Sequence, residues 1–224
     1  AGCSANGVGS GGAIFSSFCG AVLTTAGAGI TITAGGASYN AGSIFNTAGI
    51  STNAGDVTLC AQAISGAGGI TTAGGAVDLL TSGTLNYSGA INSGGGAVTL
   101  ASQSGAVNSV NVNAGAGTIE ATGRSLSGGT YQTTGTVNLT ATAGSISVYN
   151  INAGIANLTA TSSVNADVVV TERVNASSTG SSVSLSNEGT GALRLGTVSG
   201  NSGLYLYSST GFEQASAGSL SSPY

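Results

Sequence analysis

Residues 50–79 read ISTNAGDVTLCAQAISGAGGITTAGGAVDL, and this stretch contains one pattern twice. Ile50 returns as Ile70, and the triplet Val57-Thr-Leu59 returns as Val77-Asp-Leu79, each after 20 residues. An apolar–polar–apolar triplet is typical of a short β-strand whose middle side chain points outward. Since strands this short cannot bury an apolar face alone, such a repeat must stack on its neighbours.

The pattern extends in three apolar columns from near residue 30 to about residue 165. The first column consists of Ile30, Ile50, Ile70, Ile91, Val112, Tyr131 and Ile151. The second consists of the triplets that begin at Val57, Val77, Val98, Ile119 and Val137. The third consists of Ile44, Ile64, Leu85, Val107, Leu126, Ile146 and Val164. Glycine-rich joints such as Ala73-Gly-Gly75 separate the columns and suit sharp corners.

This arrangement predicts an all-β chain that folds as a right-handed parallel β-solenoid, a three-sided β-helix with about 20 residues per coil. We expect residues 29–224 to form the solenoid, with regular coils to about residue 165 and less regular coils after it. Residues 1–28 are expected to form an N-terminal cap or assembly segment, because a solenoid needs cover at its ends. No 18-residue apolar run occurs, so no transmembrane segment is predicted.

Charged residues are scarce in this chain. Three Lys or Arg residues, seven Asp or Glu residues and no His give a net charge of −4. A nucleic-acid partner is not expected, because phosphate binding requires clustered basic side chains. A surface of Ser, Thr and Asn with little charge favours an extracellular location.

The three cysteines allow two arrangements. A disulfide between Cys3 and Cys19 would close a short N-terminal loop and leave Cys60 unpaired. The alternative is that all three cysteines are free thiols that are buried or merely tolerated in the fold.

Several short segments resemble the repeats of filamentous-haemagglutinin-like and autotransporter-like bacterial surface proteins. They include Ala54-Gly-Asp-Val-Thr-Leu59, Gly95-Gly-Ala-Val-Thr-Leu100 and Gly135-Thr-Val-Asn-Leu-Thr140. The resemblance implies an exported, non-enzymatic right-handed β-helix that serves as an adhesive stalk or fibre at the bacterial cell surface. Partners would then be host or surface glycans, besides further copies of the chain.

Little in the sequence favours catalysis, and we expect neither an enzyme nor a bound metal or cofactor. Asp78 and Glu120 fall two coils apart on one outward column, about 10 Å from each other, a separation that inverting glycosidases use. A carbohydrate-cleaving or carbohydrate-binding solenoid therefore remains an alternative. Without His or Lys, however, the common nucleophilic dyads and triads cannot form.

A second alternative is ice binding by a polar column. The outward residues beside the first apolar column are Thr31, Ser51, Thr71, Asn92, Asn113, Gln132 and Asn152. Stacked hydroxyls and amides can form a stabilising ladder, or they can form the regular face that binds ice. The change from hydroxyl to amide along the column favours the ladder.

Sequons place candidate N-glycosylation sites at Asn86, Asn138, Asn157 and Asn175. The candidate assembly contacts are Phe15 and Phe18 near the N-terminus and Tyr205 and Tyr207 near the C-terminus. Because open strand edges pair with other copies, we expect a head-to-tail filament subunit or a rod of a surface adhesin.

Overall fold

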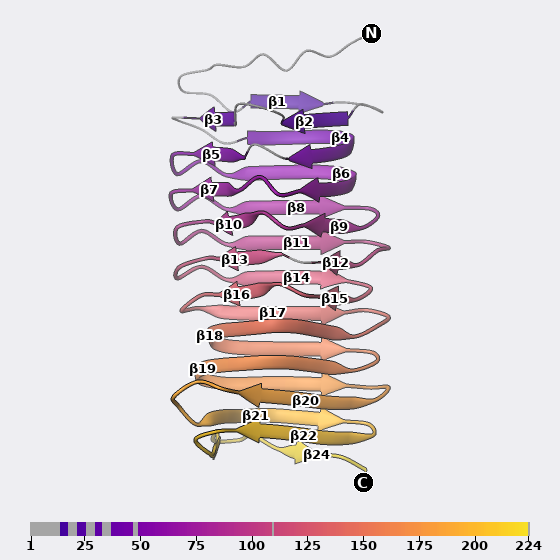
Figure 1. The fold of residues 1–224 in the computed structure, drawn as a ribbon, viewed down its shortest axis with the longest axis vertical. Coiled ribbons are helices and arrows are strands. Elements are labelled where there is room, and N and C mark those ends of the chain that lie inside the picture. The colour runs from indigo at the N-terminus through magenta and orange to yellow at the C-terminus, as the bar shows by residue number, and fades with distance from the viewer. Residues whose placement is uncertain are drawn as a thin grey trace.

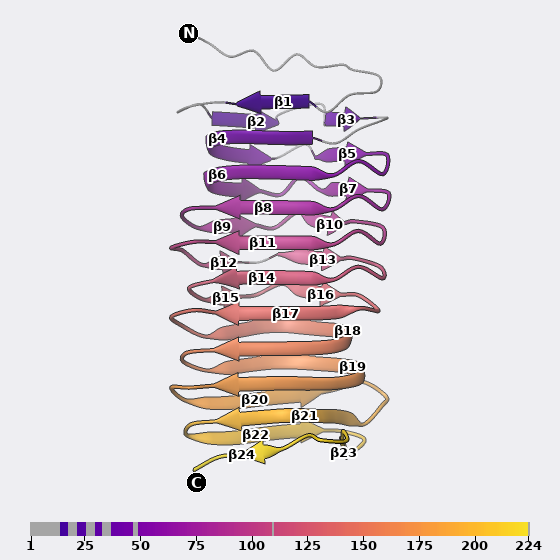
Figure 2. The ribbon, with the colours of Figure 1, turned by 180° about the vertical axis from the view of Figure 1, so that it is seen from behind.

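The chain folds as one tall stack of parallel strands (Figures 1 and 2). The computed structural model describes residues 14–17, 22–25, 30–32, 37–46, 49–108 and 110–223, and before residue 49 the only side chain it describes is that of Ile44. In these residues 24 strands form a single sheet without any helix. The stack makes about 9 turns of about 20 residues, which confirms the predicted parallel β-solenoid.

The strands have the following bounds: β1 Ile14–Ser17, β2 Val22–Thr25, β3 Ile30–Ile32, β4 Ala37–Asn46, β5 Ile50–Thr52, β6 Val57–Gly66, β7 Ile70–Thr72, β8 Val77–Thr81, β9 Leu85–Tyr87, β10 Ala90–Asn92, β11 Val98–Ser102, β12 Val107–Asn108, β13 Asn111–Asn113, β14 Ile119–Gly123, β15 Leu126–Ser127, β16 Thr130–Gln132, β17 Thr136–Ala141, β18 Ile146–Ala160, β19 Val164–Ser178, β20 Ser182–Asn187, β21 Leu193–Gly200, β22 Gly203–Ser208, β23 Phe212–Gln214 and β24 Leu220–Ser221.

Each predicted apolar column is a line of paired residues in the sheet. Ile70 pairs with Ile91 in the first column, and Val77 pairs with Val98 in the second. Leu85 pairs with Val107 in the third. The members from Ile44 onward are buried and belong to one continuous core. The three columns are therefore confirmed, and one strand per column and coil explains the 20-residue period.

The first described strands belong to the same stack. β1 pairs in parallel with β4, with Ile14 beside Ala37, and β2 pairs with the far part of β4, with Leu23 beside Ile44. Two strands of the segment expected to act as a cap thus continue the sheet.

Towards the C-terminus, successive strands merge. β18 and β19 each run for 15 residues and cross all three columns of a coil. Their pairing has register shifts between Val148 and Ile151 and between Ala153 and Ile155. The chain therefore turns these corners by irregular pairing within a strand and not by a separate turn.

In several coils, buried hydroxyls hold the corner that follows the first column. Thr52, Thr72 and Ser93 are buried, and each donates a hydrogen bond to the carbonyl of the residue three positions later: Gly55, Gly75 and Gly96. Because these carbonyls lie at a turn, the hydroxyls supply partners that the strand ladder does not.

Glycines are required at this corner because the backbones of adjacent coils nearly touch. An added Cβ at Gly96 would lie 2.1 Å from the Gly75 carbonyl oxygen, and one at Gly117 would lie 2.2 Å from that of Gly96. Any larger residue would push the coils apart. The glycine-rich joints of the sequence are therefore sites of close coil contact as well as turns.

Candidate functional site

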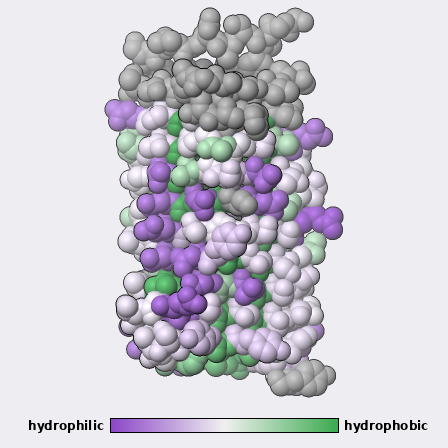
Figure 3. Space-filling model, in the orientation of Figure 1, coloured by the Kyte–Doolittle hydropathy of each residue, from purple (hydrophilic) through white to green (hydrophobic). Residues whose placement is uncertain are grey.

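The C-terminal end of the solenoid exposes its apolar interior. A cavity of about 490 Å³ at this end is lined by Leu195, Leu204, Leu206, Phe212, Gln214 and Leu220. Phe212 is 51% exposed and Leu220 is 47% exposed. Figure 3 shows hydrophobic side chains at the lower end of the molecule, where the last coils lie. We call Leu204, Leu206, Phe212 and Leu220 the open end.

The last three strands among the described residues each pair on one side. β22 pairs with β20, and β23 and β24 both pair with β21. Within the described residues none of these three strands has a partner on its other side. An ion pair between Arg194 Nε and Glu213 Oε2, at 2.9 Å, joins β23 to the coil before it. Over residues 203–221 the open end therefore combines apolar side chains with strands that pair on one side only.

Tyr205 and Tyr207 stand beside the open end. They lie on the outward side of β22 and are 64% and 60% exposed, whereas Leu204 and Leu206 pack against the core. The tyrosines thus face sideways from the stack. Of the other predicted assembly contacts, Phe15 lies in β1 with only its backbone described, and Phe18 lies outside the described residues.

A third exposed tyrosine lies on the same side of the solenoid. Tyr149 is 74% exposed and lies at the register shift of β18, where Tyr149 and Asn150 together face Asp167 of β19. Asp167 pairs with Ser186, and Ser186 pairs with Tyr207. The outward column therefore runs from Tyr149 through Asp167 and Ser186 to Tyr207.

Asp167 is held by hydrogen bonds on both oxygens. Asn150 Nδ2 donates to Oδ2 at 3.1 Å, and Ser186 Oγ donates to Oδ1 at 3.3 Å. In the next outward column, Asn165 pairs with Ser184, which pairs with Tyr205. We call Tyr149, Asn165, Asp167, Ser184, Tyr205 and Tyr207 the tyrosine face.

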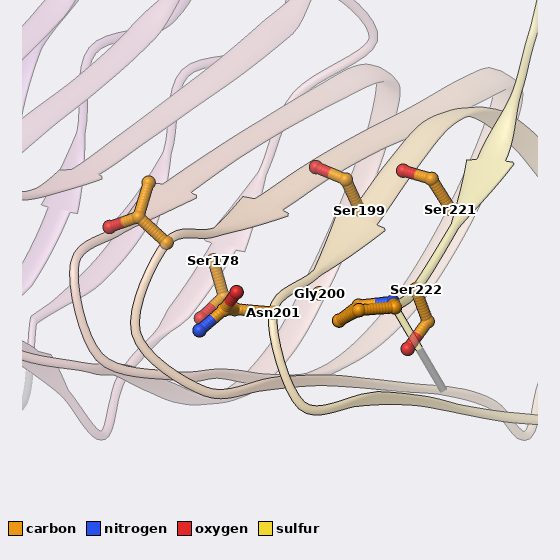
Figure 4. Close-up of a pocket in the computed structure, with 8 residues that line it drawn as sticks. Ser178, Ser199, Gly200, Asn201, Ser221 and Ser222 are labelled. Atoms are coloured by element: carbon orange, nitrogen blue, oxygen red, sulfur yellow. The ribbon is translucent and has the colours of Figure 1, made fainter.

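A separate polar pocket lies where the second column turns towards the third. Its volume is about 550 Å³, and its lining consists of Ser178, Thr179, Ser199, Gly200, Asn201, Ser221, Ser222 and Pro223. The hydroxyls of Ser199 and Ser221, which are paired neighbours, point the same way (Figure 4). The Ser178 hydroxyl already donates to the Ser162 carbonyl. With a lining of hydroxyls and one amide, the pocket offers hydrogen bonds but no acid or base.

Asp78 and Glu120 lie where the sequence places them. Both pair with Thr99, from opposite sides, so they are two strands apart on one outward column, at about 10 Å. The column lies on the outer face of the sheet, and neither the apolar cavity nor the polar pocket includes it. The arrangement therefore has the spacing of an acid–base pair on an outward-facing column of the sheet.

An amide ladder runs along the outward side of the second column, closer to the C-terminus than Asp78 and Glu120. Asn157 Nδ2 donates to Asn138 Oδ1 and Asn175 Nδ2 donates to Asn157 Oδ1, both at 2.8 Å. The Thr197 backbone N–H then donates to Asn175 Oδ1 at 2.9 Å. Within the described members of the column proposed for ice binding, residues 51–152, no such bond joins one coil to the next. The ladder therefore forms on a different column from the one that the sequence favours.

Three of the four sequon asparagines are the members of this amide ladder and are half-buried, whereas Asn86 is exposed on β9. A sugar attached to Asn157 or Asn175 would replace a hydrogen on a nitrogen that already donates within the ladder. Asn86 is therefore the sequon whose amide is most accessible.

Cys60 is a half-buried free thiol on the outward side of β6. Burial, together with the nearby Asp78 carboxylate, raises the pKa of this thiol, which disfavours the nucleophilic thiolate. Cys3 and Cys19 lie outside the described residues.

No three carboxylate or thiol side chains come together as a metal site in the part of the chain that the structure describes. The same residues contain no helix that is long and apolar enough to cross a membrane.

Comparisons with protein-family models, with curated proteins and with solved structures gave no match for this chain.

Proposed function

We propose that this chain is a secreted, non-enzymatic structural protein whose solenoid serves as a filament subunit or as a rod of a bacterial surface adhesin. The observation that carries the proposal is the open end, where apolar side chains and free strand edges occur together. Exposed apolar surface and unpaired edges both favour pairing with another β-structure. End-to-end β-stacking of a second copy would cover the apolar side chains and pair the free strand edges.

Symmetry indicates what such stacking would produce. A contact between two different ends of identical rods does not close on itself, so it propagates into a filament. The scarcity of charge on the chain, with a net value of −4, leaves little repulsion between copies. The resemblance to filamentous-haemagglutinin-like repeats also supports an exported rod, with its partners at the cell surface.

Negative-stain electron microscopy of the purified chain over a range of concentrations tests this proposal. The expected result is fibres of uniform width whose length increases with concentration. The double variant F212D/L220D places two carboxylates on the exposed open end and should leave short single rods. Thr118→Asp, which adds a carboxylate at an exposed position of a middle coil, is the matched control and should form fibres.

The result that would contradict the proposal is a wild-type chain that stays as single rods at every concentration. Fibres of normal length from F212D/L220D would show that assembly uses another surface. Secretion is tested separately by fractionation of the producing cells, where we expect the chain at the surface or in the medium.

A further inference from the structure

We infer that the tyrosine face is a binding site for neutral oligosaccharides. The inference does not rest on filament assembly: the site and the open end share β22, but Tyr205 and Tyr207 face outward, whereas Leu204 and Leu206 pack against the core. Three tyrosines, each at least 60% exposed, lie on this face. Exposed apolar groups that gather on one face with polar residues around them mark interaction sites more often than single exposed residues do.

The spacing of the rings suits an extended ligand. Tyr205 and Tyr207 are two residues apart on one strand, about 7 Å. Tyr149 and Tyr207 are separated by three strand spacings, about 14 Å along the stack. The Tyr205 ring packs beside the chain at Gly203, since an added Cβ there would lie 3.5 Å from it. The rings therefore outline a platform that several linked sugar rings can cover.

Polar groups between the rings match the hydroxyls of a sugar. Asp167 is fixed by Asn150 and Ser186, so its carboxylate is already positioned and retains lone pairs that can accept further hydrogen bonds. Asn165 and Ser184 add groups that both donate and accept. Aromatic faces that pack on apolar C–H groups, with nearby acceptors for hydroxyls, are the chemistry that a pyranose ring presents to a protein.

The charge of this face selects among sugars. Residues 146–150, 164–167, 182–188 and 203–208 contain two ionisable carboxylates, Asp167 and Glu188, and no basic residue. Uronic acids and sulfated sugars would be repelled, because no cation balances their charge. The ligand class is therefore a neutral saccharide.

The test is titration of the purified chain with cellohexaose, mannohexaose and xylohexaose, with hexagalacturonate as the acidic comparison. Binding can be followed by tyrosine fluorescence, since the chain has seven tyrosines and no tryptophan, and by calorimetry. At least one neutral hexasaccharide should bind more tightly than hexagalacturonate. Tyr149→Ala, Tyr205→Ala and Tyr207→Ala should each weaken that binding roughly three- to tenfold.

Combining the three substitutions should abolish binding without lowering the melting temperature, because the side chains are exposed. The control Asn113→Ala, on the exposed outer face of β13, should leave the affinity unchanged. Asp167→Asn replaces an acceptor oxygen with a donor and removes a negative charge. It should lower the affinity for the neutral sugar and raise the affinity for hexagalacturonate.

Three results would overturn the inference. One is that none of the neutral hexasaccharides binds better to the wild type than to the triple variant. Another is that hexagalacturonate is the preferred ligand. The third is that Y205A/Y207A shortens fibres in the microscope and leaves saccharide titrations unchanged, which would make these tyrosines assembly contacts.

Discussion

Replacing Thr72 with valine should destabilise the coil around it by about 2 kcal/mol. Thr72 is 1% exposed, and its hydroxyl lies 2.5 Å from the Gly75 carbonyl oxygen and 3.0 Å from that of Ser93. Valine keeps the shape and the β-propensity but removes the donor. The Ser93 carbonyl keeps the Gly74 amide as a partner, so the cost falls mainly on the buried Gly75 carbonyl. Because a buried acceptor that loses a hydrogen bond costs about 1–3 kcal/mol, the hydroxyl and not the methyl should account for the change.

Urea denaturation measures the loss of stability for the whole chain, and amide hydrogen exchange measures it at the corner itself. With a slope near 2 kcal/mol/M, a loss of about 2 kcal/mol lowers the urea midpoint by about 1 M. The Gly74 amide donates to the Ser93 carbonyl at 2.8 Å, so it reports on the same corner. Its exchange should accelerate about 30-fold, since each 1.4 kcal/mol is about a factor of ten.

The control is the neighbouring residue on the same strand. Thr71 is exposed on β7, so Thr71→Val makes the same chemical change with water available to the hydroxyl, and it should alter stability by less than about 0.5 kcal/mol. A Thr72→Val variant as stable as the wild type would refute the role assigned to the buried hydroxyls. An equal loss in both variants would show that replacing threonine by valine is destabilising in itself, whether or not a buried hydrogen bond is lost.

Four further outcomes are expected. Asn157→Ala removes two amide–amide bonds and should cost about 1–2 kcal/mol in urea denaturation. Ala54 has a φ of 64°, so Ala54→Gly should stabilise the chain by up to about 1 kcal/mol, measured as a higher urea midpoint. Burial raises the pKa of Tyr131 far above its usual value, so absorbance titration at alkaline pH should show that this ring ionises only on unfolding. The stability that accompanies its burial is complete below the unfolded pKa of about 10 and is lost as the pH rises above it. Since burial and then Asp78 raise the pKa of the Cys60 thiol, Asp78→Asn should accelerate maleimide labelling of Cys60, measured by peptide mass spectrometry.

Each of these four predictions has an outcome that contradicts it. Asn157→Ala could leave the midpoint unchanged, which would mean that water replaces the ladder without cost. A lower midpoint for Ala54→Gly would show that the alanine contributes more by stiffening the unfolded chain. Ionisation of every tyrosine below the unfolding pH would contradict the burial of Tyr131. Equal labelling rates would show that Asp78 does not influence Cys60.

The sequence predicts the columns well because each is a local rule repeated many times. Ile70, Ile91 and Val112 occupy one line since every coil needs an apolar residue there, and an error in one coil would not change the period. The same reasoning correctly places Asp78 and Glu120 on one outward column. Periodicity therefore determines position along the sheet and direction into or out of the core.

Periodicity does not determine which outward groups bond to one another or where the pattern is interrupted. The amide ladder needs three Asn residues in adjacent coils, and Asn138, Asn157 and Asn175 satisfy this while Asn92 and Asn113 do not form the equivalent bonds. Tyr149 was missed because its exposure follows from a register shift in β18, where two consecutive residues face outward. The sequence signal was the pair Tyr149-Asn150 between two apolar residues, which strict alternation cannot accommodate.

The close coil contact at Gly75, Gly96 and Gly117 bears on how such a chain can evolve. Each of these three coils carries its own glycine at this corner and meets only the coils directly above and below it. Duplication of one 20-residue unit inside the stack would therefore reproduce every contact that it needs and leave both tips unchanged. The length of the rod can then vary among descendants in increments of about 4.8 Å per duplicated coil, without any redesign of what the tips or the sides bind.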